Sequence, residues 1–325
     1  MYELRYPLFD GKRVWEGAAV TVENGVITAV QPCDPATCAQ GFLLPALIDA
    51  HAHMGTAAHV AAMLRSGVAT VCDVSAAAAL EDADRHLTLV RSAGMAMGMV
   101  LSPRSYVEQA AANGAKYIKV LLFSACSIGK PALCGIVKAA HEWGLRVAVH
   151  ATELATVRQA VAAGSDILLH VPMKEAFPRS LAAEIAEKGI AVAPTLVMMQ
   201  TFAKSGKNGY QPTDYQNAEN AVRLLRDCGV TILAATDANP GTFAPAVGYG
   251  QSLHEEMYLL TKAGLTPLEA LTAATGSNAN AFGLNAGAIA SGQPATMLLV
   301  DGRPDQQITD SHKIQKIWVR GDVIR

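Results

Sequence analysis

The feature that most constrains the fold is an alternation, through the middle of the chain, of short apolar runs with alanine-rich amphipathic stretches. This alternation is typical of βα units in a parallel sheet. The apolar runs are eight in number and lie at residues 43–49, 67–74, 95–102, 116–123, 146–151, 166–171, 190–197 and 230–237. With helical stretches between them, such as 154–164 and 174–189, they predict an α/β chain folded as a closed (β/α)8 TIM barrel. An open doubly wound sheet is disfavoured, because no glycine-rich dinucleotide-binding turn follows the first run.

The two ends of the chain differ from the middle. Residues 18–30 predict two short β-branched strands around Glu23-Asn24-Gly25, because Asn-Gly accepts the positive φ of a tight hairpin turn. The C-terminal stretches "TMLLVDGRPDQQ" and "IQKIWVRGDVIR" have the same pattern of strands and turns. Between the seventh and eighth runs, the polar, glycine-bearing segment 200–217 predicts a lid-type loop over the barrel mouth.

Charge and hydropathy restrict the class of partner. The 26 basic and 28 acidic residues are scattered without blocks and give a net charge of −2, which argues against nucleic acid or a membrane surface as the partner. A small molecule is the expected partner. The N-terminal stretch "MYELRYPLFDGKR" has no apolar core of a signal peptide, and no segment approaches the uninterrupted apolar length that spans a bilayer. We therefore expect a soluble cytoplasmic protein.

Two histidines follow the first apolar run, in "LLPALIDAHAHMG" at residues 43–55. Because side chains alternate faces along a strand, His51 and His53 point the same way and can bind one ion. A single H-x-H pair at a half-solvated strand end is more often ordinary surface. A zinc site needs three or four ligands that converge from different segments, so the other strand ends decide between the two interpretations.

Together with these two histidines, four more titratable residues lie at the predicted strand ends or, in one case, within a strand. The set comprises His51, His53, Lys119, His150, His170 and Asp237. In a parallel barrel the C-terminal strand ends surround one mouth, where active sites are built. Taken singly, the histidines of strands five and six could be core residues satisfied by backbone carbonyls, and the aspartate could cap the next segment. Convergence on one mouth favours metal ligands, with Asp237 as both ligand and base.

Lys119 is unusual because "YIKVLLF" places an ammonium group inside an apolar strand, where an unpaired charge is unfavourable. If its side chain faces the barrel interior, burial favours the neutral amine, which can react with carbon dioxide to give a carbamate. A carbamate is an anionic oxygen ligand that can bridge two metal ions. The alternative is that Lys119 pairs with a carboxylate in the barrel.

The stretches "PALIDAHAHM", "GAKYIKV" and "ATDAN", together with His150 and His170, resemble the amidohydrolase superfamily over nearly the whole chain. The stretches "GVATVCDVS", "VRQAVAAGSDILLH", "AGLTPLEALTAATGSNANAFGL" and "GAIASGQPATMLLVDGRP" resemble its imidazolonepropionase-like and Xaa-Pro dipeptidase-like branch. The resemblance implies that both chain ends form one small composite β-sandwich domain, residues 1–42 and 284–325, beside a barrel of residues 43–283. A homo-oligomer is also implied.

The same resemblance implies a binuclear metal site. His51, His53 and Asp237 would hold one ion and His150 and His170 the other, with carboxylated Lys119 and a hydroxide bridging the two. Zinc is the expected metal, although manganese or iron suits a similar ligand set. The hydroxide would attack the substrate carbonyl, and Asp237 would accept its proton and pass it to the leaving group.

Two positions differ from the sequence pattern expected for this branch. Tyr249 precedes Gly250 where a His-Gly pair is expected, so a substrate-facing position differs, and Thr296 replaces the usual aspartate near the C-terminus. The candidates for substrate contact, near the mouth or in the lid segment, are Arg104, Tyr106, Thr195, Tyr210 and Tyr249.

These observations favour hydrolysis of an amide, either a cyclic amide or a dipeptide-like compound including Xaa-Pro. A lactonase or esterase is the alternative on the same site, because the same hydroxide attacks esters. A mononuclear deaminase is disfavoured by Lys119, since that branch generally lacks the lysine. A metal-free scaffold or binding protein and a zinc store are the alternatives outside enzymes. Retention of the full ligand set argues against the scaffold.

Overall fold

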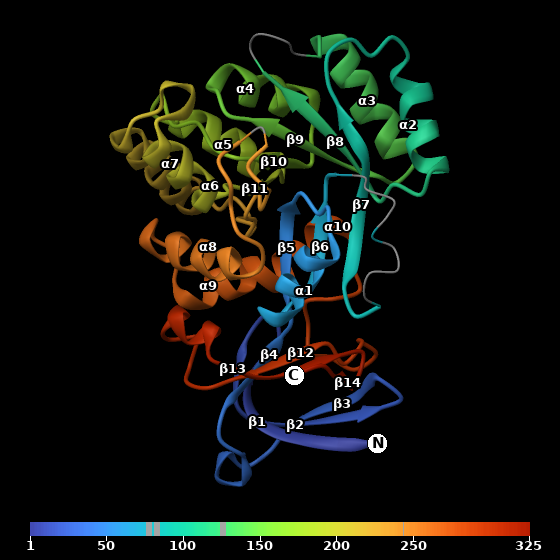
Figure 1. Ribbon diagram of the computed structural model, residues 1–325, viewed down its shortest axis with the longest axis vertical. Helices are drawn as coiled ribbons and strands as arrows, with labels where there is room; N and C mark the ends of the chain where they lie inside the picture. The colour runs from blue at the N-terminus through green and yellow to red at the C-terminus, as the bar shows by residue number, and fades with distance from the viewer. Residues whose placement is uncertain (76–79, 81–84, 124–127, 243) are drawn as a thin grey trace.

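The computed structural model describes residues 1–75, 80, 85–123, 128–242 and 244–325. Two sheets organise them (Figure 1). One sheet is a barrel of parallel strands surrounded by helices, and the other collects the strands of both chain ends beneath the barrel in this view. The predicted α/β barrel with a separate β domain formed from both chain ends is therefore confirmed.

The barrel strands follow one another in chain order around the sheet, as βα repeats with short connections favour. They are β5 (Leu47–Ala52), β6 (Val68–Asp73), β7 (Thr88–Ala96), β8 (Tyr117–Leu122), β9 (Arg146–Ala151), β10 (Ile167–Leu169) and β11 (Ala191–Ala193). Each of these strands pairs in parallel with its neighbours, so the C-terminal strand ends lie at one mouth.

The helices pack around the barrel wall (Figure 1). They are α1 (Ala57–Arg65), α2 (Pro103–Ala112), α3 (Lys130–Glu142), α4 (Leu154–Ala163), α5 (Arg179–Glu187), α6 (Leu196–Ser205), α7 (Tyr215–Asp227), α8 (Gln251–Lys262), α9 (Pro267–Thr272) and α10 (Asn278–Phe282). Over the ranges that the structure describes, no helix combines the length and the apolarity that crossing a membrane requires.

The eighth predicted strand closes the barrel without forming a regular strand. Two parallel bridges, Val192 to Ile232 and Ala52 to Ala238, join this segment to β11 on one side and to β5 on the other. Asp237 has a positive φ of 55°, which interrupts an extended ladder. The barrel is closed by a few bridges and hydrogen bonds at this seam.

The chain-end sheet has the order β14-β13-β12-β4-β1-β2-β3. Its strands are β1 (Tyr2–Phe9), β2 (Val14–Glu23), β3 (Val26–Pro32), β4 (Phe42–Pro45), β12 (Met297–Val300), β13 (Ile314–Val319) and β14 (Asp322–Val323). The predicted hairpin turn joins β2 to β3, with Asn24 and Gly25 at φ values of 49° and 78°. The domain limits 1–42, 43–283 and 284–325 stay predictions.

The barrel interior is filled by small and branched side chains with one aromatic pair at its base. Tyr117 of β8 and Phe282 of α10 meet edge to face, with ring centroids 5.2 Å apart. Both belong to a buried cluster with interior residues such as Ala148, Leu169 and Leu233. Packed side chains therefore fill the base of the barrel, and the polar groups of the site lie at the opposite end, at the strand C-termini.

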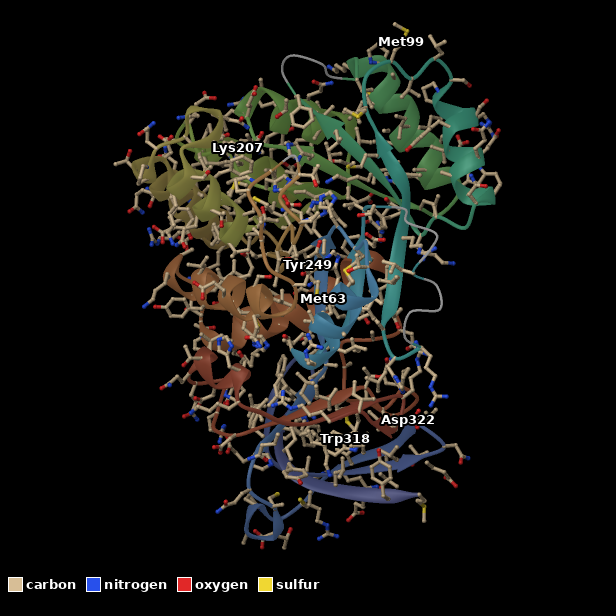
Figure 2. All side chains as sticks on the ribbon, in the orientation of Figure 1. Met63, Met99, Lys207, Tyr249, Trp318 and Asp322 are labelled. Atoms are coloured by element: carbon tan, nitrogen blue, oxygen red, sulfur yellow. The ribbon has the colours of Figure 1, made fainter. Side chains whose placement is uncertain are left out.

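Three predictions of element boundaries were wrong. The third strand is β7 (Thr88–Ala96) and not residues 95–102, because pairing with β6 and β8 determines its position. Met99, in the apolar run that was predicted as a strand, is 85% exposed (Figure 2). The run 43–49 is divided at Ala46 between β4 and β5. The segment 200–217 is not a lid-type loop, since α6, two short 3-10 turns and α7 occupy most of it.

His254 of α8 joins the barrel to the chain-end domain. Its Nε2 lies 2.9 Å from the carbonyl oxygen of Ser66 after α1, and its Nδ1 lies 2.9 Å from the Ser311 hydroxyl in the 3-10 helix Ile308–His312. Because a carbonyl only accepts, Nε2–H donates to Ser66 and the Ser311 hydroxyl donates to Nδ1. This arrangement requires a neutral ring, and burial, aided by neighbouring His312, lowers the pKa of His254 to about 4.

This joint should weaken in acid. Because the pKa of His254 is lower in the folded state than when unfolded, its contribution is complete above about pH 6.5 and is lost as the pH falls toward about 4. We expect the stability difference between wild type and His254→Gln to shrink by about 2 kcal/mol from pH 7 to pH 5, measured by urea unfolding. His141→Gln, an exposed histidine on α3, is the control. A difference that does not change with pH would contradict this role.

Candidate metal centre

The barrel mouth carries three strained backbone positions. His170, Thr195 and Asp237 follow β10, β11 and the eighth segment and have φ values of 73°, 51° and 55°. Non-glycine residues rarely adopt such angles, and they persist where the surrounding structure holds them, often at functional sites. Residues at three adjacent strand ends are thus turned out of the regular strand direction, next to the histidines of β5.

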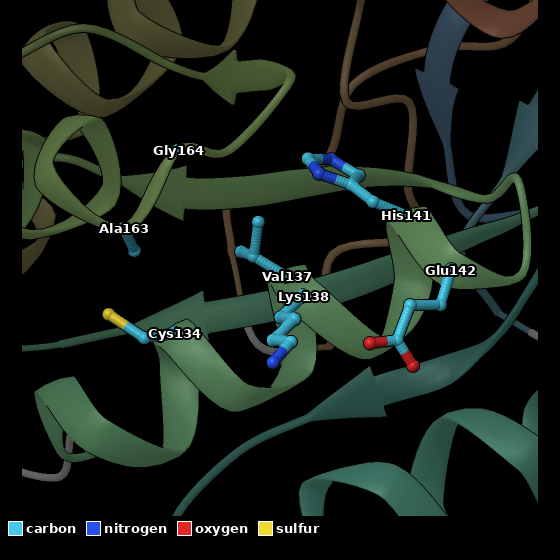
Figure 3. Close-up of a pocket in the computed structure, with 7 residues that line it drawn as sticks. All are labelled: Cys134, Val137, Lys138, His141, Glu142, Ala163 and Gly164. Atoms are coloured by element: carbon cyan, nitrogen blue, oxygen red, sulfur yellow. The ribbon is translucent and has the colours of Figure 1, made fainter.

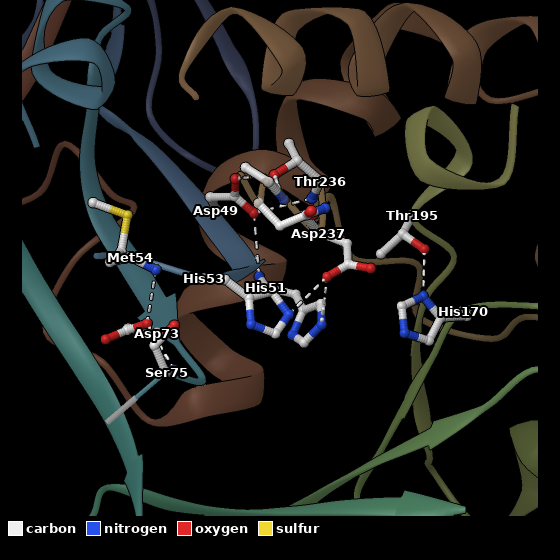
Figure 4. A network of polar contacts seen from close by, with 12 residues as sticks. Asp49, His51, His53, Met54, Asp73, Ser75, His170, Thr195, Thr236 and Asp237 are labelled. Carbon is white, nitrogen blue, oxygen red and sulfur yellow. Dashed lines mark hydrogen bonds and ion pairs between the residues drawn. The ribbon is translucent and has the colours of Figure 1, made fainter. Parts of the chain in front are cut away.

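His51 and His53 converge on one carboxylate (Figure 4). Their Nε2 atoms lie 3.2 Å and 3.0 Å from the same oxygen, Oδ1 of Asp237. Burial by itself raises the pKa of Asp237, but the charge of His51 and the hydrogen bonds from His51 and His53, with a smaller effect of the His170 charge, outweigh it and hold that pKa well below its usual range. The aspartate is therefore an anion.

The other two histidines lie beside this group. The ring centroid of His170 is 4.4 Å from that of His150 and 5.5 Å from that of His51. The ligand atoms of His51, His170 and Asp237 all lie within 4.8 Å of one another, which is close enough for them to hold one ion. Burial lowers the pKa of His51 to about 4 and that of His150 to about 3, so both rings are neutral at pH 7, the form that binds metals.

Lys119 lies among these groups on β8. Its side chain is 1% exposed, and no hydrogen-bond partner for its Nζ exists among the described residues. No described carboxylate forms an ion pair with it, which argues against the paired-lysine alternative. Burial lowers the pKa of Lys119 to about 7, against the opposing effect of the Asp237 charge, so a large fraction is the neutral amine near neutral pH.

Thr195 fixes the orientation and tautomer of His170 (Figure 4). The threonine hydroxyl donates to the carbonyl oxygen of Pro194 at 2.8 Å and lies 2.7 Å from Nδ1 of His170. Because its single hydrogen is used, the hydroxyl accepts from Nδ1–H, and Nε2 of His170 is left as the lone-pair nitrogen. Nε2 is buried and has no partner among the described residues. It is a nitrogen arranged to bind a cation.

Asp49 is a functional residue that the sequence analysis did not identify. Its fully buried side chain accepts hydrogen bonds from the amides of His51 and Thr236 through Oδ1 and from the Thr236 hydroxyl through Oδ2. Burial raises the pKa of Asp49 to about 7. By binding both sides of the barrel seam, Asp49 aligns His51 with Asp237. An aspartate inside the apolar run before H-x-H was the available signal.

Two of the candidate substrate contacts lie on α2, away from the histidines. Arg104 is on the surface and pairs with Glu108 and Glu142 at 3.0 Å each. Tyr106 packs against the core outside the barrel, and its hydroxyl has no partner among the described residues. The structure does not bring either residue to the group of metal-ligand candidates.

Besides Thr195, described above, the candidates Tyr210 and Tyr249 remain, and they differ from each other. Tyr210 lies between the two 3-10 turns, and its ring packs edge to face on that of Phe202. The Lys174 ammonium lies over the Tyr210 ring, 4.8 Å from the ring centroid. Tyr249 lies at the metal-ligand group itself, where its hydroxyl donates to the carbonyl oxygen of His53 at 2.8 Å. Burial, aided by nearby carboxylates, raises the pKa of Tyr249 to about 12, so this hydroxyl is protonated at neutral pH.

A surface hollow of about 570 Å³ lies outside the barrel, between α3 and α4 (Figure 3). It is lined by residues such as Cys134, Lys138 and Glu142 and is wide open to solvent. It contains none of the mouth residues, so it is not the candidate site.

The fold and these groups define a (β/α)8-barrel protein with a candidate metal centre at the mouth. The model of the amidohydrolase family matches residues 42–324, and the chain belongs to this family. In sequence alone, no curated protein matches the chain.

Similar solved structures include a Xaa-Pro dipeptidase with methionine bound in its active site, with a TM-score of 0.84 and 19% identity over 99% of both chains. A putative prolidase from Bifidobacterium longum has a TM-score of 0.80 and 22% identity over 99% of this chain and 94% of its own. The ochratoxinase of A. niger has a TM-score of 0.83 and 18% identity over 99% and 95%. At these identities the likeness shows the fold alone.

The role of Thr195 can be tested through metal affinity. Thr195→Val keeps the branched shape but removes the hydroxyl that accepts from His170, so we expect zinc affinity to fall roughly 10- to 100-fold, measured by competition with a chelator. Thr195→Ser retains the hydroxyl and should bind zinc nearly as well as wild type. Equal affinities for the valine variant and wild type would show that Thr195 does not orient His170.

Proposed function

We propose that this chain is a metal-dependent hydrolase that cleaves an amide bond in a small molecule. The observation that carries the proposal is the convergence of four histidines, Lys119 and Asp237 at the barrel mouth, where two buried nitrogens have no partner among the residues that the structure describes. Leaving a buried polar atom unpaired costs about 1–3 kcal/mol, which a bound cation would offset. The family and the names of several structural neighbours, Xaa-Pro dipeptidase and prolidase, support amide chemistry.

The described residues fit two divalent ions, with zinc as the metal we expect from imidazole and carboxylate ligands. In this proposal His51, His53 and Asp237 would hold one ion, His150 and His170 would hold the other, and Lys119, as a carbamate, would supply an anionic oxygen ligand to the pair. To form it, the neutral Nζ bonds to the carbon of carbon dioxide and releases a proton to solvent. When bound, such ions lower the pKa of water and polarise a carbonyl.

The chain's own groups then have distinct tasks. Asp237 accepts a proton from the attacking water at its carboxylate and returns it to the nitrogen that leaves when the amide C–N bond breaks. The base plug of Tyr117 and Phe282 keeps bulk water out of the site from below. Thr195 and Asp49 hold His170 and His51 in place, so the site is organised before substrate arrives.

The proposed substrates are cyclic amides or dipeptide-like compounds, including Xaa-Pro dipeptides. A lactonase or esterase would use the same groups, and a parallel screen of amides and lactones separates the two. In a metal-free scaffold, two buried nitrogens would have no partner within the described part of the chain, which disfavours it. A cytoplasmic location and a homo-oligomer stay predictions from the sequence.

Metal content per chain is the primary test. Protein purified without chelator and with bicarbonate present should contain about two ions per chain by elemental analysis. Lys119→Met should reduce this to about one, because the bridging ligand is lost. Lys116→Met, an exposed lysine three residues earlier, should leave it unchanged. One ion or none in the wild type, persisting after metal and bicarbonate are supplied, would rule out the binuclear proposal.

Asp237→Asn tests proton transfer. With the metals retained, we expect kcat to fall roughly 10²- to 10⁴-fold and KM to change little, because the amide cannot accept the proton. Metal content is measured on the same samples, so that loss of a ligand is distinguished from loss of a base. Asp301→Asn, on the chain-end domain, is the control. Near-wild-type kcat with metals in place would exclude Asp237 as the base.

A further inference from the structure

β5 holds His53 less firmly than it holds His51. β5 ends at Ala52, so His53 lies one residue beyond the ladder, and its side chain is 29% exposed against 3% for His51. Its Nε2 nevertheless lies at 3.0 Å from Asp237 Oδ1, slightly closer than that of His51. Interactions outside the strand must therefore fix the backbone of His53.

One peptide group after the strand is bound from both sides. The carbonyl oxygen of His53 accepts from the Tyr249 hydroxyl at 2.8 Å. On the other side of the same peptide group, the amide nitrogen of Met54 donates to Oδ1 of Asp73 at 3.0 Å (Figure 4). These two atoms belong to the same planar peptide group, so the two bonds restrict its rotation. The amide of His53 also donates to the Ala238 carbonyl at 2.8 Å.

Tyr249 is itself braced against α1. Its ring stacks on His59 with centroids 3.7 Å apart and an interplanar angle of 11°, and Nδ1 of His59 accepts from the amide of Gly55 at 3.2 Å. The next residue, Gly250, has a φ of 80°, and a Cβ there would come within 2.5 Å of the Ala62 carbonyl oxygen. Only glycine permits this approach, which brings Tyr249 over α1 (Figure 2).

Asp73 is equally fixed. It ends β6, is fully buried, and its Oδ1 also accepts from the amide of Ser75 at 2.9 Å. The His53–Met54 peptide is thus bound by residues from two elements that are distant in sequence, the end of β6 and the loop before α8.

We infer that Tyr249 and Asp73 are a pair of positioning residues that act through the His53–Met54 peptide to set the His53 imidazole against Asp237. The inference rests on the proposed metal function and gives Tyr249 a role other than substrate contact. The hydroxyl that binds His53 is engaged with the backbone, and the ring is covered on one face by His59. Loss of either contact lets the peptide rotate, and His53 leaves the ligand position.

Tyr249→Phe is the test, because it keeps the ring and its stacking and removes only the donated hydrogen bond. We expect the affinity for cobalt, used as a spectroscopic probe metal, to fall roughly tenfold or more. The visible absorption of the cobalt-loaded protein should change, since the ligand geometry changes. With both proteins free of metal, the Met54 amide of Tyr249→Phe should exchange with deuterium faster than that of wild type. The melting temperature of the variant should stay close to that of wild type.

Tyr106→Phe is the matched control, because it removes a hydroxyl with no partner among the described residues. It should leave cobalt affinity, spectrum and exchange unchanged. Asp73→Ala should lose cobalt affinity, because it removes the acceptor for the Met54 amide. Asp73→Asn keeps an oxygen acceptor and should retain most of the wild-type affinity. A general packing defect would not produce this difference between the two variants.

The outcomes separate the two levels of inference. If wild type takes up no cobalt, the proposed metal function fails, and the positioning role fails with it. If wild type binds cobalt and Tyr249→Phe binds it as tightly, only the positioning role is wrong. A variant that raises KM for a substrate at unchanged cobalt affinity would return Tyr249 to substrate contact and overturn the inference.

Discussion

Closure of the barrel between β5 and the segment 231–238 is the constraint on which the site depends. The amide of Asp237 donates to the carbonyl of His51 at 2.8 Å, and the amide of His53 donates to the carbonyl of Ala238 at 2.8 Å. These bonds place the first and last parts of the barrel side by side, although about 190 residues separate them in the sequence. Without this seam His51 and His53 would not meet Asp237, the carboxylate to which both bind.

The seam is short because its polar groups serve the site. Asp49 accepts the amides of His51 and Thr236, which a regular ladder would bond to backbone carbonyls, and Asp237 leaves the extended conformation altogether. Backbone pairing is thus partly replaced by a buried carboxylate that sets the direction of two neighbouring side chains. The seam therefore has fewer backbone ladder hydrogen bonds than a regular strand pair, and side-chain hydrogen bonds hold the candidate ligands in a fixed arrangement, as is usual at functional sites.

The sequence predicted the barrel and the residues at its mouth, because both follow from period-two alternation and from counting apolar runs. It could not predict Asp49, Asp73 or the role of Thr195, whose hydrogen bonds depend on backbone atoms that only the folded chain brings near. The third strand was misplaced for a related reason: Arg91 interrupts the apolar pattern of β7, while Met99 continues it in an exposed loop. Pairing with neighbours, and not hydropathy, determined that strand.

The same geometry explains why the chemistry is easier to infer than the substrate. Strand ends are fixed by the barrel, so the side chains placed there keep one arrangement, and the types of those side chains indicate the reaction. Among the side chains proposed for substrate contact, Thr195 is bonded to His170 and Tyr249 to the backbone of His53, whereas Arg104 pairs with two glutamates on the surface. Substrate recognition by Tyr210 and by other residues around the mouth stays a proposal, because loops carry these positions and can change while the strand ends stay the same.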